Sequence, residues 1–465
     1  MAATARTGTE HFPEHFPTEH FPGGVRVNGL ERRFELRARG TNVPREVLAG
    51  VTTFLTMVYI VVVNPIILSQ AGVPFQQVFM ATILATVIGT LWMGLFANYP
   101  IAIAPGMGMN AYFAYAVAGN AGVPYDVAFG AVFVAGVLFL LLSLTRFREA
   151  LIRAIPDNLK HGITAGIGLF IAFIGLRLSG IVTKHPENLV TLGDLRAPAT
   201  ALALVGLLVT TVLFVLRVPG ALFFGMVFTG AVAYGLGMLR FDDGFVSVPS
   251  MPEWLVFESP WQAVLDVVHH GLYAVVFSFL LVTLFDTTGT MIAVAEQAGL
   301  LKNGMMPRVQ HALLADSVAT TVGAMLGTSP TSAYIESSTG VAAGGRTGLT
   351  AVVVAGLFIL SAFFAPTVSA VAGLAAITAP ALIVVGSLML QSLRHIRWDR
   401  FEEAFPAFLI ALTMPLTSSI ATGIALGFIA HPLLMLFSGR GRTVHPLLWL
   451  FAVLFLVQLL FLPHV

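Results

Sequence analysis

The sequence predicts an all-α polytopic membrane protein with fourteen transmembrane segments, arranged as two inverted repeats of seven. Three observations indicate this fold. First, the 465 residues are 57% hydrophobic and only 10% charged, whereas soluble proteins carry about 25% charged residues. Second, apolar runs near the roughly 20 residues that a helix needs to cross a bilayer follow one another along most of the chain. Third, Lys and Arg gather on one side of the resulting topology.

Residues 1–40 precede the apolar runs and are expected to form a disordered N-terminal tail. They contain no apolar stretch that could form the core of a signal peptide. The motif Glu-His-Phe-Pro occurs three times, at 10–13, 14–17 and 19–22. A metal-binding histidine tract is one interpretation of this repeat. The favoured interpretation is a disordered segment punctuated by prolines.

Fourteen candidate spans follow the tail, and a further apolar segment at 445–462 is either a fifteenth span or an interfacial helix. The expected ranges are 47–68, 76–97, 100–118, 127–145, 160–179, 198–217, 219–238, 270–296, 308–327, 329–344, 349–371, 374–393, 402–418 and 420–437.

The distribution of Lys and Arg sets the orientation of these spans. When the spans are numbered from a cytoplasmic N-terminus, most of the basic residues fall in inside segments, and the longest outside loop, 239–269, is acidic. By the positive-inside rule the chain is expected to be a multi-pass protein of the cell (inner) membrane with its N-terminus in the cytoplasm. The basic residues at or in outside segments are Arg177, Lys184, Arg196 and Arg240.

The third and tenth spans hold corresponding places in the two halves, and both are irregular. One is YPIAIAPGMGMNAYFAY and the other is GTSPTSAYIESSTGVAAGG, and each begins with an extended, proline-bearing stretch before it becomes helical. Such backbone cannot face lipid, because its N–H and C=O groups would be unpaired. A matched pair of interrupted segments is typical of a binding site at the middle of the membrane in secondary transporters.

Two of the acidic residues inside the expected spans are the main candidates for a ligand-binding role. Asp286 lies in the middle of the eighth span, and Glu336 lies in the helical part of the tenth. A charge at the bilayer centre costs about 2.5 to 3.5 kcal/mol, so such residues usually face a cavity, pair with a partner or bind a ligand. The alternative for each is an interior carboxyl bonded to Ser or Thr of a neighbouring helix. We favour the ligand-binding interpretation for both.

Other polar residues extend this candidate site. Asp286 and Thr290 share one helical face, and Asn110 lies where the third span turns helical, either as a ligand contact or as a helix cap. The N-termini of the half-helices would add backbone N–H donors. The pair Asn64-Pro65 is interpreted as a helix kink. Asp316, inside the ninth span, needs a partner that the sequence does not identify.

Four separated blocks resemble the AzgA-like branch of the nucleobase–cation symporters, a set of hypoxanthine, guanine and adenine permeases. The blocks are GVTTFLTMVYIVVVNPIIL, ATILATVIGTLWMGLFANYPIAIAPGMGMNAYFAY, LFDTTGT and SAYIESSTGVAAGGRTGLTAVV. The resemblance implies short β-strands in spans 3 and 10, and a division into core and gate domains. The implied domains are core at 41–145 and 269–371 and gate at 146–240 and 372–440. Outside the resemblance, we expect an extracytoplasmic loop at 241–268 and a C-terminal apolar helix at 441–465.

The resemblance also implies which residues bind the substrate. Asp286 and Glu336 would hydrogen-bond the base, and Asn110 and Thr290 match polar positions of the family. The Gln-Asn pattern of xanthine and urate carriers is replaced by Glu-Ser-Ser in span 10, which argues against those substrates. The substrate-binding positions expected are Asp286, Glu336, Asn110, Thr290, Ala111, Ile335 and Ser337.

The function expected from these residues and this resemblance is import of purine bases by proton symport, with an elevator-like movement of core against gate. Either Glu336 or Asp286 would carry the coupled proton, because burial and access to water change the proton occupancy of a carboxyl. We expect no cofactor beyond this H⁺, no metal, no nucleic acid, contact with membrane lipid, and a homodimer from the resemblance alone. The alternatives are a carrier of uracil, xanthine or an inorganic anion on the same fold, and an intramembrane enzyme, which the absence of cysteine and of a His beside Asp286 or Glu336 in the sequence disfavours. The sequence has no P-loop glycine pattern, so nucleotide hydrolysis is not expected to drive the protein.

Overall fold

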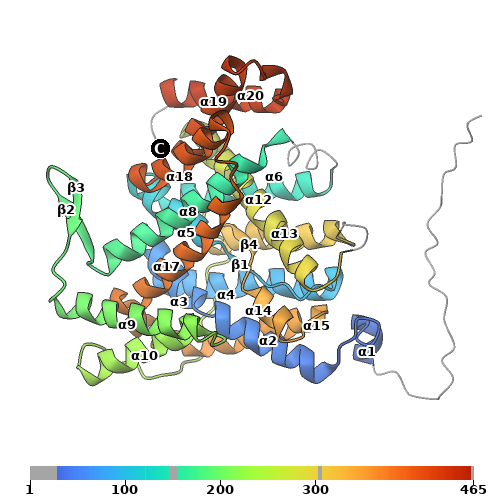
Figure 1. Cartoon of the computed structure of the whole chain (residues 1–465). Coiled ribbons are helices and arrows are strands. Elements are labelled where there is room, and N and C mark those ends of the chain that lie inside the picture. The colour runs from blue at the N-terminus through green and yellow to red at the C-terminus, as the bar shows by residue number, and fades with distance from the viewer. Residues whose placement is uncertain (1–28, 121, 146–153, 302–305, 462–465) are drawn as a thin grey trace, which may run out of the picture.

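A computed structural model of the chain describes residues 29–120, 122–145, 154–301 and 306–461 (Figure 1). Helices make up most of it, and two small two-stranded sheets accompany them. One sheet, β1 with β4, lies among the helices, whereas the hairpin of β2 (Val182–His185) and β3 (Leu189–Leu192) projects from the helical body.

Nine helical segments of the described residues are apolar and long enough to cross a membrane. Several combine two or three elements that follow each other without a loop. They are α2–α3 (Val43–Met57, Ile60–Ser69), α4–η1 (Phe75–Trp92, Met93–Ala97), α6 (Tyr125–Ser143), α8 (Asp157–Leu178), α9 (Pro198–Val215), α12 (Tyr273–Gln297), α15–η3–α16 (Gly348–Ser361, Ala362–Phe364, Ala365–Ala372), α17–η4 (Ala375–Met389, Leu390–His395) and α19 (Ile420–Phe437).

Five further segments complete the fourteen that the sequence predicts. Three are the shorter or more polar helices α10 (Ala221–Gly235), α13 (Val309–Leu326) and α18 (Phe401–Thr417). The other two are the irregular spans. Span 3 consists of β1 (Ile103–Pro105), α5 (Met107–Ala111) and the π-helix η2 (Tyr112–Asn120), and span 10 consists of β4 (Thr331–Ala333) and α14 (Ser337–Ala342). The predicted strands in spans 3 and 10 are therefore confirmed.

Four helical elements of the described residues lie outside these spans, and the first is α1 (Gly29–Phe34). The acidic loop 239–269 contains α11 (Pro260–His269), which packs against α6, and a short turn η5 (Gly441–Thr443) precedes α20 (Pro446–Phe461). The α20 helix is the predicted apolar segment 445–462. The ring of Phe277 in α12 lies 4.8 Å from the ring of Phe451 and 5.4 Å from that of Phe455, so α20 is packed along the body of the molecule.

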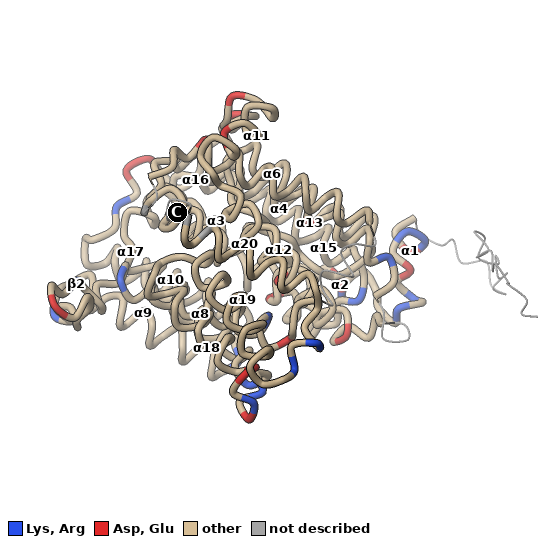
Figure 2. The backbone as a smooth tube through the Cα atoms, turned by 90° about the horizontal axis from the view of Figure 1, so that it is seen from above, with Lys and Arg blue, Asp and Glu red and all other residues tan. Residues whose placement is uncertain are grey.

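Most charged residues lie at the ends of the helices and in the connections between them (Figure 2). The middle of the molecule is formed mainly by uncharged residues, as the low charge content requires. Acidic residues mark the loop around α11, and basic residues mark the region of α1. The cytoplasmic N-terminus stays a prediction from the positive-inside rule.

The helices pack as two groups. We call α2–α6 with α12–α16 the core group, in which α4 packs against both α13 and α15. We call α8–α10 with α17–α19 the flanking group, in which α8 packs against α17 and α18. Glycines permit the close approach in this second group, because a Cβ on Gly168 would lie 2.7 Å from the carbonyl oxygen of Gly386.

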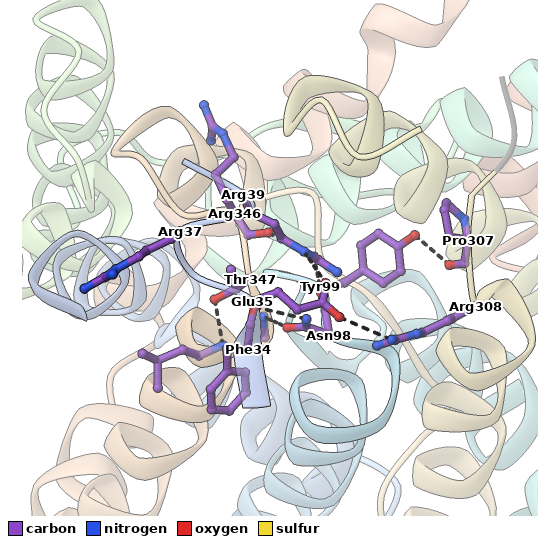
Figure 3. Close-up of polar contacts among 12 residues, drawn as sticks. Phe34, Glu35, Arg37, Arg39, Asn98, Tyr99, Pro307, Arg308, Arg346 and Thr347 are labelled. Atoms are coloured by element: carbon purple, nitrogen blue, oxygen red, sulfur yellow. Dashed lines mark hydrogen bonds and ion pairs between the residues drawn. The ribbon is translucent and has the colours of Figure 1, made fainter. Parts of the chain in front are cut away.

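The expectation that residues 1–40 are a disordered tail is wrong for residues 29–40. Gly29–Phe34 form the helix α1, and the side chains of Phe34 and Leu36 are buried against Leu349 of α15. Arg39 donates through Nη1 to the backbone oxygens of Asn98 (2.6 Å) and Arg346 (3.2 Å) (Figure 3). A few apolar side chains between charged ones suffice for this docking, although they form no long hydrophobic run. Residues 1–28, with the three repeats, lie outside the described residues.

Candidate substrate site

The two irregular spans meet through an antiparallel pair of strands at the centre of the core group. Ile103 pairs with Ala333, and Pro105 pairs with Thr331. The contact continues past the strands, because the N–H of Gly106 donates to Pro330 O (2.8 Å) and the N–H of Tyr334 donates to Ala102 O (3.0 Å). Both half-helices therefore start from one buried structure, in which the extended backbone has hydrogen-bond partners that lipid could not supply.

Glu336 lies at the start of α14, as the residue that precedes its first turn, rather than inside the helix as the sequence indicated. Its side chain is half-buried. One carboxylate oxygen, Oε1, accepts a hydrogen bond of 2.8 Å from the hydroxyl of Tyr59, which comes from the bend between α2 and α3. The other oxygen has no partner among the residues that the structure describes.

Asp286 is half-buried in α12 and is placed next to span 10 by its neighbour Thr287. The hydroxyl of Thr287 accepts a hydrogen bond of 3.2 Å from the N–H of Ala333, three residues before Glu336. The structure therefore brings the segments that carry the two predicted acids into direct contact, as the sequence analysis expects of a shared site.

Asp316 is the third acid of this region, and the structure identifies the partners that the sequence did not. Its carboxylate is fully buried and accepts from Thr287 Oγ1 at 2.5 Å and from Thr331 Oγ1 at 2.6 Å. One donor belongs to α12 and the other to β4. Asp316 thus joins the helix that carries Asp286 to the strand that leads to Glu336.

Asn110 is not a helix cap, because Gly106 occupies the capping position of α5. Its amide donates through Nδ2 to Asn64 Oδ1 at 2.9 Å, and Asn64 Nδ2 donates in turn to Thr82 (2.7 Å) and Thr328 (2.8 Å). Asn110 Oδ1 is buried and has no partner within the described part of the chain. Asn64 is therefore more than part of a kink: it is the polar centre that holds Asn110.

The remaining predicted site residues differ in how accessible they are. Thr290 is half-buried one turn after Asp286, and Ile335 exposes 53% of its surface beside Glu336. Ala111 is buried inside α5. The hydroxyl of Ser337 accepts from Ala102 N (3.0 Å), and the backbone N–H of Ser337 donates to Tyr334 O (3.1 Å). The O–H of the same hydroxyl can still donate to a substrate.

The sequence analysis missed Tyr59 and did not identify the roles of Thr287, Asn64 and Asp316. Their polar side chains lie in apolar spans, where each needs a hydrogen-bond partner, and this could have indicated that they form contacts inside the protein. Within the described ranges no three His, Asp or Glu side chains are placed to hold a metal ion.

The chain is similar over most of its length to transporters of known substrate. It is 63% identical over 431 residues to the guanine/hypoxanthine permease PbuO of Bacillus subtilis. The matched residues make up 92% of this chain and 100% of that protein. It is 43% identical over 443 residues to the adenine permease AdeP of Escherichia coli, with 93% of this chain and 96% of the relative covered. These relatives are permeases and not enzymes.

The fold is found in solved structures as well. The transmembrane domain of the cyanobacterial bicarbonate transporter BicA matches with a TM-score of 0.60 at 16% identity, covering 81% of this chain and 96% of that one. SLC26A9 matches with a TM-score of 0.65 at 11% identity, covering 89% and 68%. These likenesses support the fold of two inverted repeats of seven spans. A family model described as the permease family matches residues 44–426, and the chain therefore belongs to this family of membrane permeases, which confirms the resemblance drawn from the four sequence blocks.

Proposed function

We propose that this chain transports purine nucleobases, with guanine, hypoxanthine and adenine as substrates, and that Glu336 and Asp286 bind the base. The observation that carries the proposal is the pair of half-buried carboxyls on elements joined by Thr287 and Ala333. The similarity to guanine/hypoxanthine and adenine permeases along more than nine-tenths of the chain supports the choice of substrate.

The chemistry of the two acids suits a purine better than an anion. A neutral purine offers ring N–H donors, and a carboxylate accepts such bonds more strongly than a neutral oxygen does. Glu336 uses Oε1 for Tyr59 and keeps Oε2 available, while Asp286 supplies a second acceptor from the neighbouring helix. Two carboxylates would repel an anionic substrate at this position.

The movement that we propose is an elevator-like displacement of the core group against the flanking group. The predicted domain boundaries follow the same division, with a core at 41–145 and 269–371 and a gate at 146–240 and 372–440. Internal polar bonds such as those of Asp316 and Asn64 tie the core elements together. A core that is braced internally can carry its substrate as one body.

Coupling to protons completes the proposal. A carboxyl that meets water in one conformation and is enclosed in another changes its proton occupancy during transport. Glu336 and Asp286 are the candidates, because each carboxyl is only half-buried. We expect uptake to depend on the proton gradient, in a chain that resides in the inner membrane with a cytoplasmic N-terminus.

The test is uptake of radiolabelled hypoxanthine, guanine, adenine, xanthine and uracil into cells that lack their own purine carriers. Glu336→Gln and Asp286→Asn are assayed beside Glu296→Gln, a control that changes an exposed acid of α12. We expect purine uptake that a proton ionophore abolishes, loss of uptake in the two site variants and normal uptake in the control. Uptake of uracil alone would refute the substrate assignment, and uptake insensitive to the ionophore would refute proton coupling.

A further inference from the structure

The hydroxyl of Tyr59 is the one protein donor that the structure places on the Glu336 carboxylate among the described residues. Tyr59 is 1% exposed, and a buried phenol needs a hydrogen-bond partner because an unpaired one loses the bonds it made to water. We infer that Tyr59 is a positioning residue of the substrate site, which holds the Glu336 carboxylate in the orientation that binds the base. This inference rests on the proposed function and adds a residue to its mechanism.

The helix that carries Tyr59 also supports the half-helix α14. A Cβ on Gly340 would lie 2.7 Å from the carbonyl oxygen of Ala49 in α2, so the two backbones touch. Farther along, the hydroxyls of Thr56 and Thr339 are 3.1 Å apart. Tyr59 lies three residues after Thr56, and its hydroxyl contacts Glu336, the residue that precedes α14. The contacts of α2 with α14 therefore hold the phenol of Tyr59 next to Glu336.

The bond leaves one carboxylate oxygen free and restricts the other. The last torsion of a glutamate side chain is broad and twofold, so a carboxyl without a fixed partner samples many orientations. With Oε1 held by Tyr59 at 2.8 Å, the direction of Oε2 is set before the substrate arrives. A binding group that is already oriented loses less conformational freedom on binding, which increases affinity.

Tyr59 also borders a cavity of about 620 Å³ that separates the core group from α10. The other walls include Val62 of α3, Met226 and Tyr234 of the α10 helix, and Leu360 of α15. The residue that orients Glu336 therefore lies beside the space that changes when the two groups move. Tyr234 faces the same cavity but is 60% exposed, which makes it a matched control.

The experiment compares Tyr59→Phe with Tyr234→Phe in hypoxanthine uptake, normalised to the amount of each variant in the membrane. Both changes remove one phenolic oxygen beside the same cavity. We expect Tyr59→Phe to raise the KM about tenfold with Vmax within about twofold of the parent, equivalent to about 1.4 kcal/mol of lost binding. Tyr234→Phe should leave both constants unchanged. An unchanged KM in Tyr59→Phe, or a fall in Vmax alone, would overturn the inference.

A second variant separates orientation from packing. Thr56→Val removes the hydroxyl that contacts Thr339 and leaves the phenol in place. Equilibrium binding of radiolabelled hypoxanthine to purified protein should weaken in Tyr59→Phe and not in Thr56→Val. Equal weakening in both variants would assign the effect to the packing of α2 on α14 and overturn the role of the phenol. If the parent binds and carries no purine, the proposed function fails and this inference falls with it.

Discussion

Asp316 and Thr331 are joined by a hydrogen bond of 2.6 Å between the carboxylate Oδ1 and the threonine hydroxyl. Because Thr331 is the first residue of β4, this bond fixes the strand to α13, and the second oxygen of Asp316 fixes α12 through Thr287. A single fully buried carboxylate thus sets the relative position of the two segments that carry Asp286 and Glu336. Asp316 therefore has a structural role: it positions the segments of the substrate site and does not itself contact the substrate.

Replacing Asp316 with Asn should therefore damage transport. The amide keeps one acceptor but presents N–H donors where a second acceptor is needed, and each lost bond to a charged acceptor is worth about 1.5 to 3 kcal/mol. We expect purine uptake to fall about tenfold or more. Ser317→Ala is the control, because Ser317 is equally buried and its hydroxyl bonds only within α13. Normal uptake in Asp316→Asn would show that the two segments hold their positions without it.

Gly340 should not tolerate a side chain. An added Cβ would meet the hydroxyl of Thr53 below van der Waals distance and the carbonyl oxygen of Ala49 at 2.7 Å. The backbone atom cannot turn aside, so α14 must move away from α2, at a cost of about 1 to 3 kcal/mol for overpacking. We expect Gly340→Ala to reduce purine uptake and the melting temperature of the purified protein.

The matched control for this change is Gly356→Ala in α15. A Cβ at Gly356 meets no atom within 4 Å, and Ala has the higher helix propensity. We expect this variant to be as stable as the parent or slightly more so. If both alanine variants behave alike in uptake and in thermal melting, the contact of α2 with α14 does not constrain the site.

The sequence predicted the spans and the two acids because these depend on composition within one segment. A long apolar run is enough to indicate a membrane-spanning helix, and an acidic residue such as Asp286 is easily recognised within such a run. The extended starts of spans 3 and 10 were visible for the same reason, through Pro105 and Pro330 and the glycines near them.

The partners of these residues could not be predicted, because each lies far away in the chain. Ala102 and Ser337 are 235 positions apart, and no local pattern indicates that they meet. Asn64 was taken for a kink since it precedes a proline, yet its amide binds Asn110. The docking of α1 was missed because Phe34 and Leu36 stand singly among charged residues, and only the surface of α15 makes them buried.

Glu46 should be required for stability. This buried carboxylate accepts from the N–H groups of Arg346 (2.9 Å), Thr347 (3.3 Å) and Thr350 (3.2 Å) at the start of α15. Glu46→Gln would place N–H donors against other donors and lose the favourable interaction of a negative charge with a helix N-terminus. We expect a loss on the order of 2 kcal/mol, seen as a lower melting temperature in detergent. Glu187→Gln, on the exposed hairpin, should melt like the parent, and identical melting of both variants would contradict the role of Glu46.

Asn98 offers a test that separates hydrogen bonding from backbone strain. Its Oδ1 accepts from Gly348 N at 2.8 Å and its Nδ2 donates to Phe34 O at 3.2 Å, so one side chain ties α15 and the N-terminal segment to the start of span 3 (Figure 3). Its φ of 58° lies in the left-handed region, which Asn tolerates better than most residues.

Asn98→Gly and Asn98→Ala remove the same two hydrogen bonds, but only Ala meets the steric cost of the left-handed conformation, about 1 to 2 kcal/mol. Both variants should therefore melt below the parent in detergent, and Asn98→Ala should melt below Asn98→Gly. Equal melting of the two variants would show that the backbone relaxes to a negative φ without loss. Melting of both at the temperature of the parent would show that the N-terminal segment and α15 are held without Asn98. Other contacts would then fix the N-terminal segment to the core group, and those of Arg39 are the first to examine.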